Sequence, residues 1–132
     1  MLKIISKIFS VFVGLTVINV WLFRSEKNTL FRGGNAGNLL EEFEVYGLED
    51  YFLIIGVVKV SLALILLLSL YFNKLRFFAS SGIAIMMLVA IYMHISIGDD
   101  LIKSMPASIL LIGSLTIAYT EKISTKWFDS YI

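Results

Sequence analysis

The chain has 132 residues, of which 58% are hydrophobic, with a net charge of +1 and a mean hydropathy of +0.88. Because soluble domains contain roughly 45–50% apolar residues, the composition indicates an integral membrane protein, and the near-neutral charge provides no basic stripe for nucleic acid. With no cysteine and a single histidine, disulfides and thiolate metal sites are excluded and we expect no metal site.

Apolar stretches long enough to cross a bilayer as helices of about 20 residues recur along the chain. We predict an all-α membrane protein, a bundle of four transmembrane helices in a single domain, with spans at about 4–23, 51–72, 77–97 and 106–119. The link 73–76 is so short that the second and third spans must form an antiparallel hairpin. The last span is short, and a start near Asp100 with a kink or restart at 104–106 is an alternative.

The first apolar stretch follows Lys3 and Lys7, as the core of a signal peptide would. It ends in Trp21-Leu22-Phe23-Arg24, however, with no cleavage site of small residues. This favours an uncleaved first transmembrane helix.

The distribution of basic residues predicts the orientation, because cytoplasmic segments carry an excess of Lys and Arg. Six basic residues lie at the amino terminus, in the 73–76 link and in the tail: Lys3, Lys7, Lys74, Arg76, Lys122 and Lys126. Four lie on the other side: Arg24, Lys27, Arg32 and Lys103. We therefore expect both termini in the cytoplasm and the loop 24–50 outside, in a bacterial cytoplasmic (inner) membrane.

The outer loop contains apolar residues at helical spacing, with acidic residues mostly on the other side of the helix. The apolar positions are Leu39, Leu40, Phe43 and Tyr46 or Gly47, and the acidic ones are Glu41, Glu42 and Glu44. This pattern predicts a short amphipathic helix on the bundle or at the interface; a solvated acidic loop is the alternative. If the protein contacts a partner through this loop, the candidate residues are acidic: Glu41, Glu42, Glu49 and Asp50.

Polar residues within the spans are the best indicators of function. Lys59 is the one charged residue of the second span, and an ammonium group at membrane depth costs about 2.5–3.5 kcal/mol. Counting about 1.5 Å per residue from the outer surface places Lys59 at about 12 Å, and His94 and Asn19 at about 6 Å. With Gly56 one turn before Lys59 and Met87 two turns before His94, these residues form our candidate ligand-binding set.

Each polar group also has a purely structural interpretation. Lys59 could extend toward the interface and pair with Glu49 or Asp50. His94 could hydrogen-bond a carbonyl group, Asn19 could join two helices, and the methionines could simply pack in the core.

Two further polar segments are interpreted as structural. Asp99 and Asp100 are typical of a helix N-cap with solvated charge. The segment 120–122 is typical of a solvated helix end.

Short motifs in three spans resemble those of the DoxX-like family of small four-helix membrane proteins. In the second span the motif is Gly56-Val57-Val58-Lys59, which follows Glu49 and precedes a leucine-rich run. In the third span it is Ala90-Ile91-Tyr92-Met93-His94, followed by Gly98-Asp99. In the fourth span it is Pro106-Ala107, followed by an apolar run that ends at Tyr119. The resemblance covers about residues 4–120. The chain departs from the family pattern in its residues 60–62, in the absence of a proline before the second span, and in its long outer loop.

The resemblance implies two kinds of function, since the family includes a subunit associated with thiosulfate:quinone oxidoreduction, partners of oxidative-stress enzymes and receptor-assembly chaperones. The first is an accessory subunit that binds a quinone or another lipophilic molecule for a membrane redox system. The second is a non-catalytic assembly factor or structural subunit. An enzyme in its own right ranks last, because no nucleophile–base pair or phosphate loop is present. The expected partners are membrane lipids and another membrane protein, with self-association through small-residue faces as a further option.

Overall fold

The computed structural model describes residues 2–23, 34 and 36–129, with side chains placed as far as Ile123. These residues form α1 (Leu2–Ile18), which continues as a π-helix (Asn19–Phe23), then α2 (Leu39–Val45), α3 (Phe52–Leu68), α4 (Lys74–Ser96) and α5 (Met105–Asp129). Short 3₁₀ turns, Glu49–Tyr51 and Leu101–Ser104, lead into α3 and α5. The predicted outer charges Arg24, Lys27 and Arg32 and the side chain of Lys126 lie outside the described residues.

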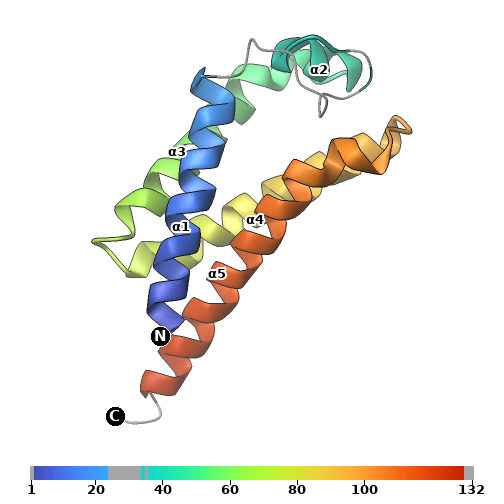
Figure 1. Ribbon diagram of the computed structural model, residues 1–132. Helices are drawn as coiled ribbons and strands as arrows, with labels where there is room; N and C mark the ends of the chain where they lie inside the picture. Colours follow the sequence, from blue (N-terminus) through green and yellow to red (C-terminus); the bar gives the residue numbers. More distant parts are fainter. Residues whose placement is uncertain (1, 24–33, 35, 130–132) are drawn as a thin grey trace.

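Four helical segments are long and apolar enough to cross a membrane: Lys3–Phe23, Glu49–Leu68, Lys74–Ser96 and Leu101–Ile123. The prediction of an all-helical protein with four membrane-length helices is therefore confirmed. The described start of α1 and the end of α5 lie at the same end of the molecule, and α2 lies at the other (Figure 1). The cytoplasmic position of the termini stays a prediction.

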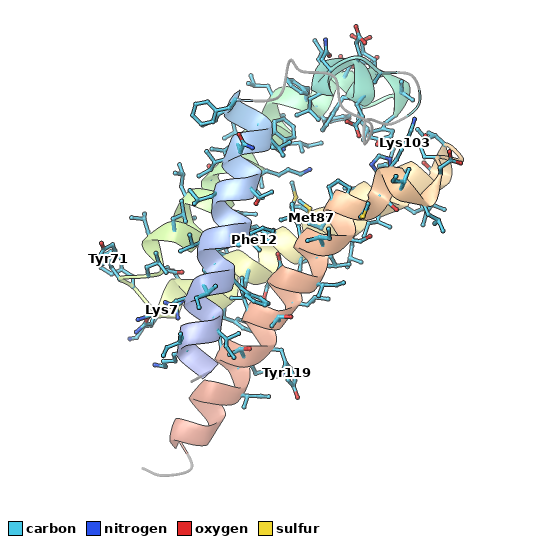
Figure 2. All side chains as sticks on the ribbon, in the orientation of Figure 1. Lys7, Phe12, Tyr71, Met87, Lys103 and Tyr119 are labelled. Carbon is cyan, nitrogen blue, oxygen red and sulfur yellow. The ribbon has the colours of Figure 1, made fainter. Side chains whose placement is uncertain are left out.

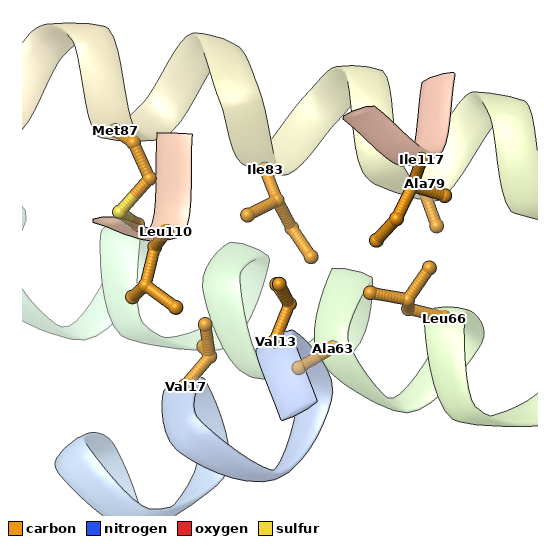
Figure 3. Packing of buried hydrophobic residues seen from close by; sticks show 9 residues of the cluster. All are labelled: Val13, Val17, Ala63, Leu66, Ala79, Ile83, Met87, Leu110 and Ile117. Carbon is orange, nitrogen blue, oxygen red and sulfur yellow. The ribbon is translucent and has the colours of Figure 1, made fainter. Parts of the chain in front are cut away.

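The four long helices pack in a ring, in which α1 and α4 each contact both α3 and α5. Their shared core is built from small and branched side chains, as Figure 3 shows for Val13, Ala63, Ile83 and Ile117. Large apolar side chains such as Leu53 (74% exposed) face outward, which suits a surface covered by lipid chains rather than by water.

The helix boundaries differ from the predicted spans on both sides of the link between the second and third spans, and at the end of the last span. Helix α3 ends at Leu68, four residues before the predicted Phe72, because the chain turns over residues 69–73. Helix α4 begins at Lys74, so Arg76 lies in its first turn rather than in a surface link. At the other junction a 3₁₀ turn precedes Met105, and α5 continues well past Tyr119, in keeping with the alternative of an early start and a restart.

A buried ion pair closes the end of the bundle near the chain ends. The side chain of Arg76 is fully buried and its Nη1 donates to Oε1 of Glu121 at 2.8 Å. Arg76 also donates to the side chain of Asn73 at 2.9 Å and to the carbonyl and hydroxyl oxygens of Ser69, and the Ser6 hydroxyl donates to Glu121 at 2.6 Å. These five residues, which we call the Arg76 clamp, join α1, α4 and α5.

The clamp corrects one sequence prediction. Glu121 was assigned to a solvated helix end together with Thr120, but both residues are buried. Glu121 finds its partner Arg76 on a helix that is distant in sequence, so that prediction was wrong. Arg76 was counted among the basic residues of the cytoplasmic side; it is buried, and the side of the membrane on which it lies stays a prediction.

Toward the opposite end of the molecule α1 separates from α5, and α2 lies across this end (Figure 1). The glycine positions show where helices remain close: a Cβ on Gly14 of α1 would lie 3.3 Å from the backbone oxygen of Ala63 in α3. The bundle is thus held together by close packing and by the clamp at one end, and it widens beneath α2.

Candidate functional site

A cavity of about 350 Å³ lies in the widened end of the bundle. Figure 2 shows Met87 between the separating helices and Lys103 near the end that α2 covers. The cavity is bordered by residues from all four long helices, from α2 and from the turn before α5: Thr16, Val17, Asn19, Val20, Trp21, Leu39, Glu42, Lys59, Met87, Ala90, His94, Lys103, Pro106, Ala107 and Leu110. Its walls are mostly apolar, with a few polar groups, as is typical of sites for small molecules.

The π-helix at the end of α1 contributes one side of the cavity. Asn19, Val20 and Trp21 are consecutive, and all three border it. The π-helical turn thus provides three neighbouring residues to the border of the cavity. Such turns occur frequently at functional sites.

Trp21 forms the wall between α1 and α3. Its indole lies directly on Gly56, where an added Cβ would be only 2.7 Å from Cζ3 of the ring. The ring also contacts the aromatic rings of Phe43 and Phe52, with centroid distances of 5.6 and 5.3 Å. A glycine at position 56 therefore permits Trp21 to pack against α3.

Lys59 borders the cavity from α3, with its Nζ 5.4 Å from the centroid of the Trp21 ring. This is within the distance at which a cation and an indole attract each other, and Glu42 attracts the ammonium electrostatically. Among the described residues, Lys59 forms no hydrogen bond and no ion pair, so the suggested pairing with Glu49 or Asp50 was wrong. Its N–H groups are available to a molecule in the cavity.

His94 connects α4 to α2 and to the loop after α4. Its Nδ1 lies 2.8 Å from Oδ2 of Asp99, and its Nε2 lies 3.6 Å from Oε1 of Glu42. The Tyr46 hydroxyl lies 3.2 and 3.3 Å from the two ring nitrogens and donates to Glu42 at 2.8 Å. We call Glu42, Tyr46, His94 and Asp99 the His94 cluster.

The loop before α2 is attached to the same cluster. The backbone N–H of Gly34 donates to Oδ1 of Asp99 at 3.0 Å, and the Lys103 ammonium donates to the Gly34 carbonyl. Gly34 has a φ of +56°, in the left-handed region that favours glycine. Gly34 is therefore held against the α4–α5 connection.

Helix α2 is defined by its cap and by one buried face. The side chain of Asn38 accepts from the N–H of Glu41 at 2.8 Å, and the Glu41 carboxylate accepts from the N–H of Gly37 at 2.7 Å. Leu39 and Phe43 are buried, which confirms the predicted amphipathic helix rather than its alternative, a solvated acidic loop. Glu42 is also buried, because it lies on the same face as these two apolar residues.

The site residues predicted from sequence fall into distinct places. Lys59, His94, Asn19 and Met87 border the one cavity, whereas Gly56 lies under Trp21 and borders a neighbouring groove. Of the acidic loop residues, Glu41, Glu49 and Asp50 are exposed, whereas Glu42 faces inward. A buried Glu42 has no surface to offer a partner.

The residues of the site that were not predicted include Trp21, Asp99 and Lys103. Asp99 was assigned to a cap with solvated charge, but its side chain is 6% exposed and contacts His94. The spacing of five residues between His94 and Asp99 was a usable signal, since a residue just past a helix end can fold back onto its last turn. The sequence contains no comparable signal for Trp21.

The surroundings of Asp99 shift the pKa of its carboxyl group. Burial by itself raises the pKa of this carboxyl group. The opposing effects are larger: it accepts hydrogen bonds from His94 and from the Gly34 N–H, and His94 and Lys103 attract it electrostatically. Its pKa therefore lies below the ordinary 3.8. A carboxylate with a lowered folded-state pKa stabilises the protein above its ordinary pKa, and the stabilisation is lost as the pH falls through the folded-state pKa.

We therefore expect Asp99→Asn to be less stable than the wild type at pH values above the ordinary carboxyl pKa, with the difference disappearing in stronger acid. The measurement is the thermal unfolding midpoint in detergent micelles across an acidic pH series. The control is Asp100→Asn, since Asp100 is exposed and its side chain forms no cap hydrogen bond. A difference between wild type and Asp99→Asn that stays constant with pH would contradict this assignment.

Comparison with known proteins adds one result to this geometry. The model of the DoxX-like family matches residues 29–118, which include α2, α3, α4 and the part of α5 that borders the cavity. No curated protein and no solved structure matches the chain.

Proposed function

This chain belongs to the DoxX-like family, and from that premise we propose that it is a non-catalytic accessory protein of a membrane redox system. In this proposal its cavity binds the polar head of a quinone or of another lipophilic carbonyl compound. The protein resides in the membrane with lipids as its immediate surroundings. A bacterial cytoplasmic membrane with both termini inside stays our prediction for its location.

The observation that carries the proposal is the ammonium of Lys59. It belongs to a segment of membrane-crossing length and borders a cavity, and within the described part of the chain it contacts an indole ring but no hydrogen-bond acceptor. An ionised group at this depth requires a partner or water. A carbonyl oxygen in the cavity would accept from Nζ and meet this requirement.

The donor set fits a quinone head. Lys59 and the Asn19 amide are hydrogen-bond donors on two different walls, and Met87 with Leu110 forms an apolar wall for a ring. The basic residues that border the cavity, Lys59 and Lys103, are matched by Glu42 and Asp99 around His94, so the surroundings suit a head without net charge. A bound quinone would supply two-electron carrier chemistry, and the chain's own residues would hold it and exclude water.

His94 has a positioning role in this proposal rather than the role of a donor to the ligand. An ionised Asp99 can only accept, so Nδ1 of His94 carries the proton that is shared with it. The other ring nitrogen faces Glu42 and Tyr46 of α2. His94 thereby holds α2 over the cavity, and Lys59 and Asn19 are left to contact the ligand.

The test is mass spectrometry of the gently purified protein, before and after solvent extraction, for the wild type and for Lys59→Met. We expect a stoichiometric quinone or similar lipophile on the wild type and its loss from Lys59→Met, with insertion and helical content unchanged. The matched control is Lys74→Met, because Lys74 is exposed in the first turn of α4 at the opposite end of the bundle. If Lys59→Met retains the same molecule, the assignment of the cavity fails.

A second candidate, an assembly factor or structural subunit, is favoured by the surface around α2. Glu41, Glu44, Glu49 and Asp50 are all exposed there, and they would suit a basic partner surface. In this case a protein would co-purify without any small molecule. Reversing the charges of Glu49 and Asp50 to lysine would then release it, whereas Lys59→Met would not.

A further inference from the structure

A groove of about 350 Å³ lies beside the cavity, between the end of α1 and the first half of α3. Its lining is apolar apart from one hydroxyl group: Trp21, Leu22, Phe52, Leu53, Gly56, Val57, Val60 and Ser61. Leu53 and Val57 are 74% and 58% exposed. In a membrane this groove would therefore open toward the lipid chains.

Trp21 borders both the groove and the cavity. On the cavity side Lys59 lies near its ring, and on the groove side the ring rests on Gly56. Because position 56 has no side chain, the Trp21 ring lies against α3 at the border of the groove. The two spaces thus meet at a single indole.

The size of the cavity limits what it can contain. At about 350 Å³ it is near the lower end of the range of roughly 300–1,000 Å³ for sites that enclose small molecules. It suits a ring-sized head but leaves no room for a long hydrocarbon chain as well. A lipophilic ligand with a tail must therefore extend out of it.

We infer that the groove between α1 and α3 binds the hydrocarbon tail of the molecule whose head lies in the cavity, with the chain passing the edge of Trp21. This inference rests on the proposed function and specifies its ligand as a long-chain compound, such as a quinone with an aliphatic or isoprenoid tail. The apolar groove provides packing for the tail, and Lys59 provides the polar contact for the head.

The test uses a quinone with a diazirine in its aliphatic tail, and a phospholipid with the same diazirine, in nanodiscs that contain the purified protein. Crosslinked residues are mapped by mass spectrometry. We expect the quinone probe to label Leu53, Val57 and the half-buried Val60 selectively over exposed residues elsewhere, such as Ile85 and Ile112 (62% and 65% exposed). The phospholipid probe should label all outward faces without preference.

A competition experiment then tests whether the tail in the groove and the head in the cavity belong to the same bound molecule. An excess of the same quinone without its tail should reduce labelling of the groove to the level of the phospholipid probe, because the head site is already filled. Val60→Phe, which fills the groove, should abolish the selective labelling while binding of the tailless quinone is unchanged. The control is Leu64→Phe, an outward residue of α3 that does not line the groove.

The outcomes separate the two proposals. If the tailless quinone binds but labelling is uniform, or if Val60→Phe leaves the labelling unchanged, the groove assignment is overturned and the head site survives. If neither quinone binds the wild type, the proposed function fails and the tail site fails with it.

Discussion

Replacing Arg76 with methionine should lower the free energy of unfolding by about 3–5 kcal/mol, the usual cost of removing one partner of a buried ion pair. The side chains of Arg76 and Glu121 are 0% and 8% exposed and 2.8 Å apart. The substitution leaves the Glu121 carboxylate without its cation among packed helices. Unfolding titrations in mixed detergent micelles measure the loss.

The double variant Arg76→Met/Glu121→Leu should recover much of this loss, because apolar residues of similar size leave no buried charge. Lys122→Met serves as the control, since Lys122 is the exposed neighbour of Glu121. A double variant that is as unstable as Arg76→Met would show that the two charges are not energetically coupled. The clamp would then be a packing feature only.

Replacing Glu42 with alanine should detach α2 from the bundle. Glu42 accepts from Tyr46 and lies next to His94, and hydrogen bonds to charged groups contribute about 1.5–3 kcal/mol each. We expect amide hydrogen exchange of residues 39–45 to become about 10- to 100-fold faster, since each 1.4 kcal/mol is a factor of ten. Exchange in the core of α4 should not change.

The control for this measurement is Glu44→Ala, which removes an exposed carboxylate from the same helix. Its exchange should match the wild type. Equal acceleration in both variants would mean that helix propensity, and not the His94 cluster, holds α2 in place. Ligand retention in Glu42→Ala would report separately whether α2 is needed to keep the cavity closed.

The two ends of the bundle contain similar groups with different consequences. The Arg76 clamp donates from all three guanidinium nitrogens to protein oxygens. At the other end the carboxylates of Glu42 and Asp99 are directed to His94, and Lys59 borders a cavity. The guanidinium nitrogens of Arg76 are therefore all used within the protein, whereas the ammonium of Lys59 is available to a ligand.

Glu42 shows how far sequence patterns extend. Glu42 follows Leu39 by three residues and precedes Tyr46 by four, so helical spacing by itself is compatible with the buried face of α2. It was nevertheless predicted to lie with the other glutamates mostly on the other side of the helix, since glutamate is rarely buried without a partner. One partner, Tyr46, is local, but His94 is more than fifty residues away along the chain, and no local pattern reveals it.

Trp21 shows a second limit of prediction from sequence patterns. The sequence placed Trp21 at the end of the first span without a role in the site, and Gly56 was predicted as part of the lysine face of the second span. The π-helix places the indole on Gly56 and thereby separates the cavity from the groove. A π-helical turn is stabilised by its tertiary contacts, so periodicity in the sequence does not predict it.

The sequence alone determined the class of the protein, because hydrophobic length and composition decide that segments enter a bilayer whatever they later pack against. It also identified Lys59, His94 and Asn19, since polar groups are conspicuous in apolar helices. Only the tertiary structure decided which charges are buried and paired, as in Arg76 with Glu121 and His94 with Asp99 and Glu42. The physical reason is that a buried charge is stabilised by a group across the bundle, and that distance is set by helix packing rather than by position in the chain.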